Sequence, residues 1–357
     1  MTPEQKQNIM TRVDKHLNDL PWFINEYIDY RIDASANTLY NYVRDYYKFF
    51  DWIVNEGIHP GPMTEIDIYT LEKLTMQNII SFERYCMRNN NRVDTIARRL
   101  NSLRSLFHYL SQVAEDEEGY PYLHRNVMVK VNIRKEKLSN KKKAEKIANK
   151  ILLDDEISAF RNFIREDYGN YLLEKNQKRK HSSYLYNRER DLALISFMLG
   201  SGLRISEALS VNVDTIDWNN NQVDITRKGD SGDVVSFSNV AAEDMKRYLE
   251  IRDDRYKVSR SNKAFFLSRK TGNGGLANRL TVRAAQLMIN HYADAFGKSS
   301  LTLHKLRHSF ATNYYKVNKD LATLKTILNH ANLETTMIYT YISNKQIEQS
   351  INKADSR

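Results

Sequence analysis

Cysteine is almost absent from this sequence, since Cys86 is the only one in 357 residues. A single thiol excludes an internal disulfide framework and a thiolate-rich zinc site. Apolar runs are also short, and none approaches the ~20 residues that a membrane helix needs. The first 17 residues are polar and lack the apolar segment of a signal peptide. We therefore expect a soluble protein of a reducing compartment, the cytoplasm.

Acidic residues are outnumbered by basic ones. The chain has 44 Asp and Glu against 54 Lys and Arg, which gives a formal net charge of +10. Such an excess favours a polyanionic partner, most simply nucleic acid, although a solvated basic surface would give the same totals. Hydrophobic residues make up 41%, and the length is sufficient for two domains with buried cores.

Residues 1–132 predict an all-helical domain. Apolar residues such as Leu39, Val43 and Phe50 recur at steps of three and four, which is the pattern of an amphipathic helix. Helices are expected at Glu4–Leu17, Trp22–Ile32, Ala36–Asn55, Thr70–Asn89 and Arg92–Ala114.

The last of these helices has a basic face, formed by Arg92, Arg98, Arg99 and Arg104. For this helix alone, a solvated face explains the arginines as well as a nucleic-acid contact does. Together with the charge of the whole chain, the pattern favours contacts to phosphates.

Residues 133–151 form a basic stretch between two parts of the chain. Arg134–Lys150 holds eight Lys or Arg against two Glu, and Lys141, Lys142 and Lys143 are consecutive. No apolar periodicity predicts a packed helix here, so we expect an interdomain linker. It is either a soluble tether or a segment that follows a phosphate backbone, and we favour the second.

Residues 152–357 predict a mainly α domain with a small antiparallel β-sheet. Val211–Ser238 alternates apolar and polar residues in three runs separated by two turns, which indicates a three-stranded meander with Lys228 in its second turn. Residues 167–187 could be a helix extension or an exposed loop. Helices are expected at Leu152–Arg165, Arg190–Leu199, Val240–Tyr256 and Leu280–Phe296.

Reactive side chains concentrate in residues 303–341, on three expected short helices. They are His304, Arg307, His308, His330 and Tyr339. Two of the histidines as bases, a fixed cation and a phenol suggest chemistry on a phosphodiester. Tyr339 alone would carry no weight, because the chain has 22 tyrosines.

Further candidates lie upstream. Arg204 stands at an expected helix start, and Glu207 follows three residues later on the same face. Each has an ordinary explanation, since Arg204 could simply pair with Glu207, and Lys228 could be an exposed lysine at a hairpin tip.

In combination these residues resemble the tyrosine site-specific recombinases, the phage-integrase and Xer family. The motifs GLRISEAL, HKLRHSFAT and LNHANLETTMIYTY stand in family order, with Lys228 between the first two. Length and the Tyr-rich residues 170–186 are most similar to the Xer members that act as a single recombinase. Two positions depart from the family pattern, because Asn329 stands where Gly is usual and Tyr341 where His is frequent.

The resemblance implies an architecture. A SAM-like core-DNA-binding domain would span 1–132, a basic linker 133–151, and a catalytic domain 152–357 with a C-terminal exchange helix at about 344–357. The two domains would close as a C-shaped clamp on double-stranded DNA, and a homotetramer would hold two sites. An FtsK-type DNA translocase is a possible partner, and no metal or other cofactor is expected.

The resemblance also implies roles. Tyr339 attacks the scissile phosphate and leaves a 3′-phosphotyrosyl link with a free 5′-hydroxyl, and strands exchange through a Holliday junction. Arg204 and Arg307 stabilise the phosphate, Lys228 is the general acid, His304 is base-like and His330 contacts phosphate. From the residues themselves, His308 is expected to be a structural hydrogen-bonding histidine, and Glu207 either to orient a neighbouring catalytic group or simply to support Arg204.

The expected biological role is resolution of chromosome dimers at a dif-like site during cell division. The main alternative is an integrase or transposase of a mobile element. A non-catalytic DNA-binding regulator and a type IB topoisomerase-like enzyme are more distant alternatives.

Overall fold

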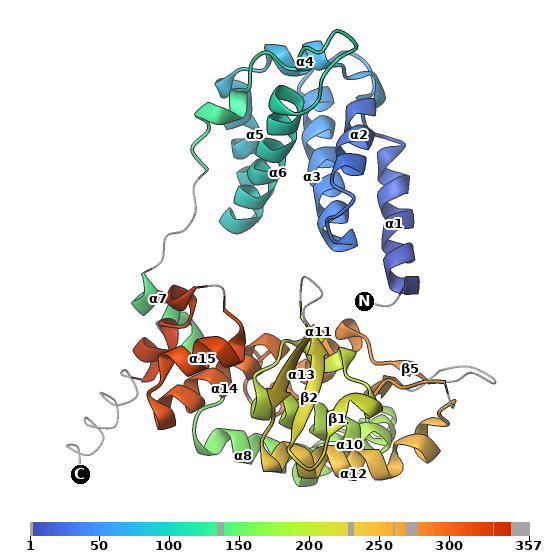
Figure 1. Ribbon diagram of the computed structural model, residues 1–357, viewed down its shortest axis with the longest axis vertical. Helices are drawn as coiled ribbons and strands as arrows, with labels where there is room; N and C mark the ends of the chain where they lie inside the picture. The colour runs from blue at the N-terminus through green and yellow to red at the C-terminus, as the bar shows by residue number, and fades with distance from the viewer. Residues whose placement is uncertain are drawn as a thin grey trace. The chain divides into compact units, whose positions relative to one another are not determined.

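The computed structural model describes residues 3–133, 139–227, 232–259, 261–268, 277–330 and 332–343. The chain forms two compact units, Met1–Lys137 and Leu138–Arg357. Both consist mainly of helices, and the second also holds small antiparallel sheets (Figure 1). The expected fold class is therefore confirmed. Within these described ranges, no helix combines the length and apolar character that crossing a bilayer requires.

The first unit packs around α3, whose buried face is rich in aromatic side chains. Ser35 begins α3 because its side chain accepts a hydrogen bond from the backbone N–H of Thr38. Phe49 and Trp52 of α3 then pack against Phe82 of α5. The helices of this unit are α1 (Pro3–Leu17), α2 (Trp22–Tyr30), α3 (Ala36–Asn55), α4 (Ile68–Lys73), α5 (Met76–Arg88) and α6 (Val93–Gln112), with 3-10 turns at Met63–Glu65 and Val127–Lys130.

The prediction of one helix at Thr70–Asn89 is wrong, because this segment forms two helices, α4 and α5. Leu74 and Thr75 have extended backbone angles between them. Thr75 and Asn78 exchange hydrogen bonds between side chain and backbone, which is a capping box. This local cap competes successfully with continuation of α4.

The second unit is organised around α10, which packs against α12 and α14. Residues 167–187, left undecided by the sequence, are largely helical and supply α9 and the first half of α10. The helices are α7 (Asn140–Ala148), α8 (Asp155–Asn162), a π-helical turn (Phe163–Asp167), α9 (Tyr168–Glu174), α10 (Lys178–Ser201), α11 (Ile205–Ser210), α12 (Asn239–Tyr256), α13 (Val282–Ala295), α14 (Leu303–Asn318) and α15 (Leu321–Leu328), with 3-10 turns at Val213–Thr215 and Leu333–Thr335.

Gly202 ends α10 and sets the approach of α14. Its φ of 69° lies in the left-handed region, which glycine enters without a steric penalty. A Cβ on Gly202 would lie 2.4 Å from Cδ1 of Phe310. The absence of a side chain therefore lets α14 pack beside the turn that leads into α11.

The predicted three-stranded meander is present. Strands β1 (Ile216–Asp217), β2 (Gln222–Thr226) and β3 (Gly232–Ser236) pair antiparallel in that order, and Thr226 lies opposite Gly232. Lys228 falls between β2 and β3, outside the described residues. A second pair, β4 (Leu267–Ser268) and β5 (Asn278–Arg279), was not predicted, because each strand has two residues and neither leaves a periodic pattern.

The basic segment differs from the expected linker. Residues 134–138 lie outside the described residues, but Asn140–Ala148 forms α7. Ala144 is buried among Ile151, Leu324, Leu328 and Tyr339 of the second unit. The prediction that no packed helix lies here is wrong, because a short helix with one small buried residue leaves almost no apolar periodicity.

Candidate active site

Glu207 and Arg204 form the first part of the site, where α11 begins. One carboxylate oxygen of Glu207 accepts the backbone N–H of Arg204 at 2.8 Å, and the other accepts Nη1 of Arg204 at 2.8 Å. The ion pair considered from the sequence is therefore present. The carboxylate is buried, whereas the Arg204 side chain is 42% exposed. One face of this guanidinium can still receive an anion.

Arg307 approaches the same carboxylate from α14. It is 3% exposed and donates to the backbone carbonyl of Leu328. Its Nη1 lies 3.8 Å from Glu207 and has no hydrogen-bond acceptor. Burial, together with the charge of Arg204, lowers the pKa of Arg307 to about 10. A buried cation with an unused donor is poised for an oxyanion, which would supply the missing acceptor.

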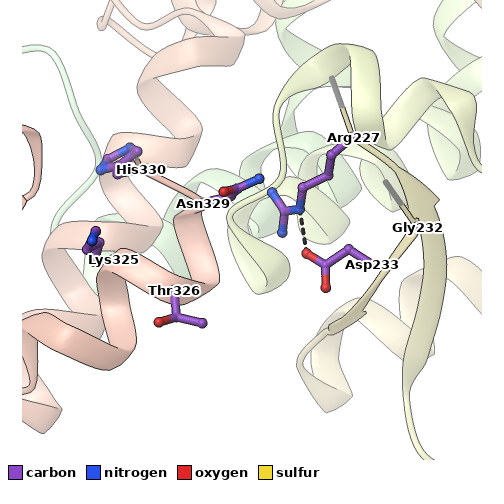
Figure 2. A pocket seen from close by; sticks show the side chains of 7 residues that line it. All are labelled: Arg227, Gly232, Asp233, Lys325, Thr326, Asn329 and His330. Atoms are coloured by element: carbon purple, nitrogen blue, oxygen red, sulfur yellow. Dashed lines mark hydrogen bonds and ion pairs between the residues drawn. The ribbon is translucent and has the colours of Figure 1, made fainter. Parts of the chain in front are cut away.

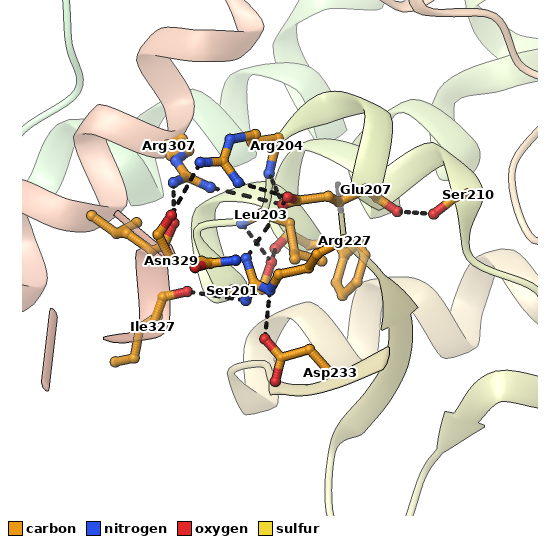
Figure 3. A network of polar contacts seen from close by, with 12 residues as sticks. Ser201, Leu203, Arg204, Glu207, Ser210, Arg227, Asp233, Arg307, Ile327 and Asn329 are labelled. Carbon is orange, nitrogen blue, oxygen red and sulfur yellow. Dashed lines mark hydrogen bonds and ion pairs between the residues drawn. The ribbon is translucent and has the colours of Figure 1, made fainter. Parts of the chain in front are cut away.

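A third arginine, Arg227, completes the group, and sequence reasoning did not identify it. It is 5% exposed and follows β2 directly. Its Nε donates to Asp233, Nη2 donates to the carbonyl of Ile327 at 3.4 Å, and Nη1 lies 3.7 Å from Glu207. Figure 3 shows the three arginines converging on Glu207.

A sequence signal for Arg227 did exist. Val223 and Ile225 of β2 are buried, and Arg227 continues their two-residue spacing. An arginine in phase with a buried face needs an internal partner, so its position indicated a network and not a solvated turn.

Asn329 stands at the position where the family pattern usually has glycine. It follows α15 with φ 45° and ψ 58°, in the left-handed region. Asn is among the few non-glycine residues that adopt this conformation readily. The carbonyl of Asn329 then accepts Nη2 of Arg204 at 3.3 Å. The end of α15 is therefore closed by a left-handed residue, and it contributes an acceptor to the site.

His330 follows and lines a pocket beside the arginines. Its Nδ1 is 2.9 Å from Oγ1 of Thr336. Burial, and then the charges of Arg307 and Arg204, lower the pKa of His330 to about 4. The imidazole is therefore neutral near pH 7 until an anion offsets those charges.

The pocket holds about 360 Å³ and lies between the base of the β2–β3 hairpin and the end of α15 (Figure 2). Its lining residues are Arg227, Gly232, Asp233, Lys325, Thr326, Asn329 and His330.

Two further histidines stand on α14. His304 is exposed, and its ring centroid is 4.6 Å from that of His308 in an edge-to-face arrangement. Desolvation, and then Lys305 and Arg307, lower the pKa of His304. Burial, and then the charges of His304 and Lys305, lower the pKa of His308 to about 3. Both rings are therefore neutral near pH 7, and His304 is able to accept a proton.

Tyr339 lies in residues 338–343, which are helical, and it is 1% exposed. Its hydroxyl is 3.0 Å from Nδ1 of His308. Burial raises the pKa of Tyr339 to about 12, although the charge of Arg307 opposes the rise. Tyr341, by contrast, is 39% exposed. The phenol of Tyr339 is thus stored away from solvent with His308 as its hydrogen-bonding partner.

Some of the residues expected to contact DNA have partners within the protein, and others are exposed to solvent. On α6, Arg98 and Arg99 pair with the buried Asp45, and Arg104 donates to the carbonyl of Val131. Arg92 is the exposed residue before α6. On α7, Lys141, Lys142 and Lys143 are exposed.

Known proteins resemble this chain along nearly its whole length. The model of the phage integrase family matches residues 162–346. Tyrosine recombinase XerS of Streptococcus uberis is 34% identical over 362 residues, covering 98% of this chain and 99% of the relative. Tyrosine recombinase XerS of Lactococcus lactis subsp. cremoris is 34% identical over 361 residues, covering 97% and 99%.

Solved structures share the fold. The XerH site-specific recombinase, in a post-cleavage complex with palindromic difH substrate, has a TM-score of 0.63 at 20% identity and covers 97% of this chain and 88% of its own. A lambda integrase dimer bound to a COC′ core site has a TM-score of 0.56 at 13% identity, covering 90% and 76%. The resemblance to single-recombinase Xer members, inferred from the sequence, is confirmed by the XerS relatives. This chain belongs to the phage integrase family and is a tyrosine recombinase, an enzyme that cleaves and rejoins DNA.

Proposed function

We propose that Tyr339 is the nucleophile of a site-specific recombination reaction centred on Arg204 and Arg307. The observation that carries this proposal is the convergence of two guanidinium groups on Glu207, one half-exposed and one buried with an unused donor. The described part of this network has three arginines, Arg204, Arg227 and Arg307. Their ion-pair partners are two carboxylates, those of Glu207 and Asp233. Three cations against two carboxylates leave a net positive charge of one, as a site for a phosphodiester requires.

The residues of this chain account for each bond and each proton of the cleavage step. The phenol oxygen of Tyr339 bonds to phosphorus and the bond from phosphorus to the 5′-oxygen breaks. The phenol proton passes to His304, and Lys228 supplies a proton to the 5′-oxygen. Arg204 and Arg307 hold the non-bridging oxygens, and each such donor typically supplies ~3–4 kcal/mol of transition-state stabilisation. His330 donates to phosphate once the bound anion favours its charged form.

Tyr339 must leave its stored position for this to occur. A phenol whose pKa is about 12 is protonated at neutral pH and, at 1% exposure, has no access to DNA. We propose that DNA binding draws residues 338–343 away from His308. Proton transfer would then take place in the assembled site, where the arginines favour the phenolate.

The relatives named XerS support a role in resolving chromosome dimers at a dif-like site during cell division. In this proposal a homotetramer in the cytoplasm joins two double-stranded sites, and an FtsK-type translocase is a candidate regulator. The two units close around DNA as a C-shaped clamp, and the C-terminal residues 344–357 couple neighbouring protomers. The alternative, a recombinase of a mobile element, would use the same site on different DNA ends.

The test uses a plasmid with two directly repeated dif-like sites. The parent protein should excise the intervening DNA, whereas Tyr339→Phe should bind the sites with unchanged affinity and excise nothing. Recombination by Tyr339→Phe would overturn the proposal. Relaxation of supercoiled DNA without a specific site, and without excision, would favour the topoisomerase-like alternative.

A further inference from the structure

Among the three arginines that converge on Glu207, Arg227 is the one for which the proposed chemistry has no task. Its guanidinium contacts three elements at once: Asp233 at the start of β3, Ile327 in α15, and Glu207 in α11. At 5% exposure it has little surface to offer DNA. Its contacts therefore indicate a role inside the protein.

Burying this cation is costly, which makes its presence informative. An isolated charge loses several kcal/mol of hydration on burial, and only good partners offset the loss. An aliphatic side chain would continue the buried face formed by Val223 and Ile225 without any such penalty. Arginine therefore contributes something that packing alone would not, namely a fixed geometry between charged groups.

The three contacted elements carry the proposed catalytic groups. Arg204 and Glu207 are at the start of α11, and His330 follows α15. Lys228 directly follows Arg227 in the chain. Through Asp233, Arg227 also joins the two strands where the hairpin leaves the sheet.

We infer that Arg227 is a positioning residue that fastens the base of the β2–β3 hairpin to Glu207 and to α15, and so sets where the hairpin delivers its proton. This inference rests on the proposed function, in which Lys228 is the general acid. Arg227 itself touches neither DNA nor the reacting atoms.

A change of leaving group separates this role from a general structural one. In a substrate with sulfur at the 5′-bridging position, the leaving thiolate needs no proton, because thiols titrate near ~8.5 whereas water titrates near ~15.7. We expect Arg227→Gln to slow cleavage of the ordinary phosphodiester by about 100-fold, at the low end of what a general acid contributes. Cleavage of the sulfur-bridged substrate should fall less than about 10-fold. Both rates are measured in single-turnover reactions at saturating enzyme.

Three variants serve as controls. Lys228→Ala should show the same rescue by the sulfur-bridged substrate. Arg307→Gln should be slow on both substrates, because the Arg307 side chain stabilises the phosphate itself. Asp233→Asn keeps the guanidinium but weakens its tie to β3, so it should show a smaller version of the Arg227→Gln pattern. Asp233→Asn and Arg227→Lys carry the test if Arg227→Gln does not fold.

The outcomes are distinct. If Lys228→Ala is rescued by sulfur and the Arg227 variants are equally slow on both substrates, Arg227 acts through Glu207 on the arginine pair and the inference is overturned alone. The inference is also overturned alone if the Arg227 and Asp233 variants cleave the ordinary substrate at the parent rate. If Lys228→Ala is not rescued, the general-acid assignment fails and the inference fails with it.

Discussion

At the scale of single residues, Asn329 shows how one backbone angle supports a site. Its left-handed conformation costs little for Asn, nothing for Gly, and roughly 1–2 kcal/mol for a residue with an ordinary side chain. We expect Asn329→Ala to lower the free energy of unfolding by about 1 kcal/mol, and Asn329→Gly to leave it within about 0.5 kcal/mol of the parent. Urea unfolding followed by circular dichroism measures both. Equal stability of the Ala and Gly variants would contradict the assigned role of φ at this position.

His308 offers a test based on pH. Its folded-state pKa, about 3, lies below the ordinary value of 6.5, so the unfolded chain binds a proton that the folded chain does not. The stability that comes from a neutral His308 is therefore complete above pH ~6.5 and is lost as the pH falls toward 3. Between about pH 6.5 and pH 5 the loss should be on the order of 2 kcal/mol.

The matched variant is His308→Gln, which keeps a hydrogen-bonding side chain beside Tyr339 but does not titrate. Its unfolding free energy should decline less steeply over this pH range than that of the parent. His304→Gln, at an exposed position, should change the slope less. Parallel curves for the parent and His308→Gln would show that His308 is not held neutral by burial.

At the scale of elements, α7 is the clearest difference between sequence and structure. Its sequence is dominated by lysine, and its buried contact is made by Ala144, a residue too small to mark an amphipathic pattern. We expect Ala144→Glu to lower the stability of the second unit by about 1–3 kcal/mol, because it places a charge in the cluster that holds Tyr339. Thermal unfolding reports the change.

Lys142→Glu introduces the same side chain on the exposed face of α7. It should leave stability within about 0.5 kcal/mol, since surface substitutions away from special features do little. If Lys142 contacts phosphate, the variant should bind DNA more weakly, and the slope of log affinity against log salt should become shallower by about 1. The reverse result, a destabilised Lys142→Glu and a stable Ala144→Glu, would contradict the orientation of this helix.

Other elements were predictable because their signals are local. α3 was expected at its observed bounds from its apolar spacing, and the structure adds the Ser35 cap at its start. The meander was expected because two turns separate three alternating runs. The break between α4 and α5 depends on one capping box, and the β4–β5 pair depends on contacts between segments that are distant in the chain, so neither was accessible from periodicity.

At the scale of the whole molecule, the site joins segments that the chain keeps far apart. Motif order indicated Arg204 and Arg307, and the structure brings both to Glu207. The partners of Arg227 and the contact between Tyr339 and His308 were not predicted, because both depend on how elements distant in the chain pack in three dimensions.

Tyr339 belongs to a small apolar cluster with Ala144, Leu324 and Leu328, which is separate from the main core of the second unit. A satellite cluster can open at a lower free-energy cost than a main core, since fewer buried contacts are lost. Release of the nucleophile therefore leaves the main core, which includes α10 and α11, intact. Local opening, and not a change in the acidity of the phenol alone, is the step at which regulation of this enzyme is expected.

The most direct measurement is the identity of the residue that becomes linked to DNA. A nicked half-site, whose cleaved strand releases the short fragment that carries the new 5′-hydroxyl, traps the covalent adduct, and mass spectrometry of the peptide maps the linkage. We predict a 3′-phosphate on Tyr339, no adduct with Tyr339→Phe, and an adduct with Tyr341→Phe. An adduct on the exposed Tyr341, or one that persists in Tyr339→Phe, would contradict this prediction.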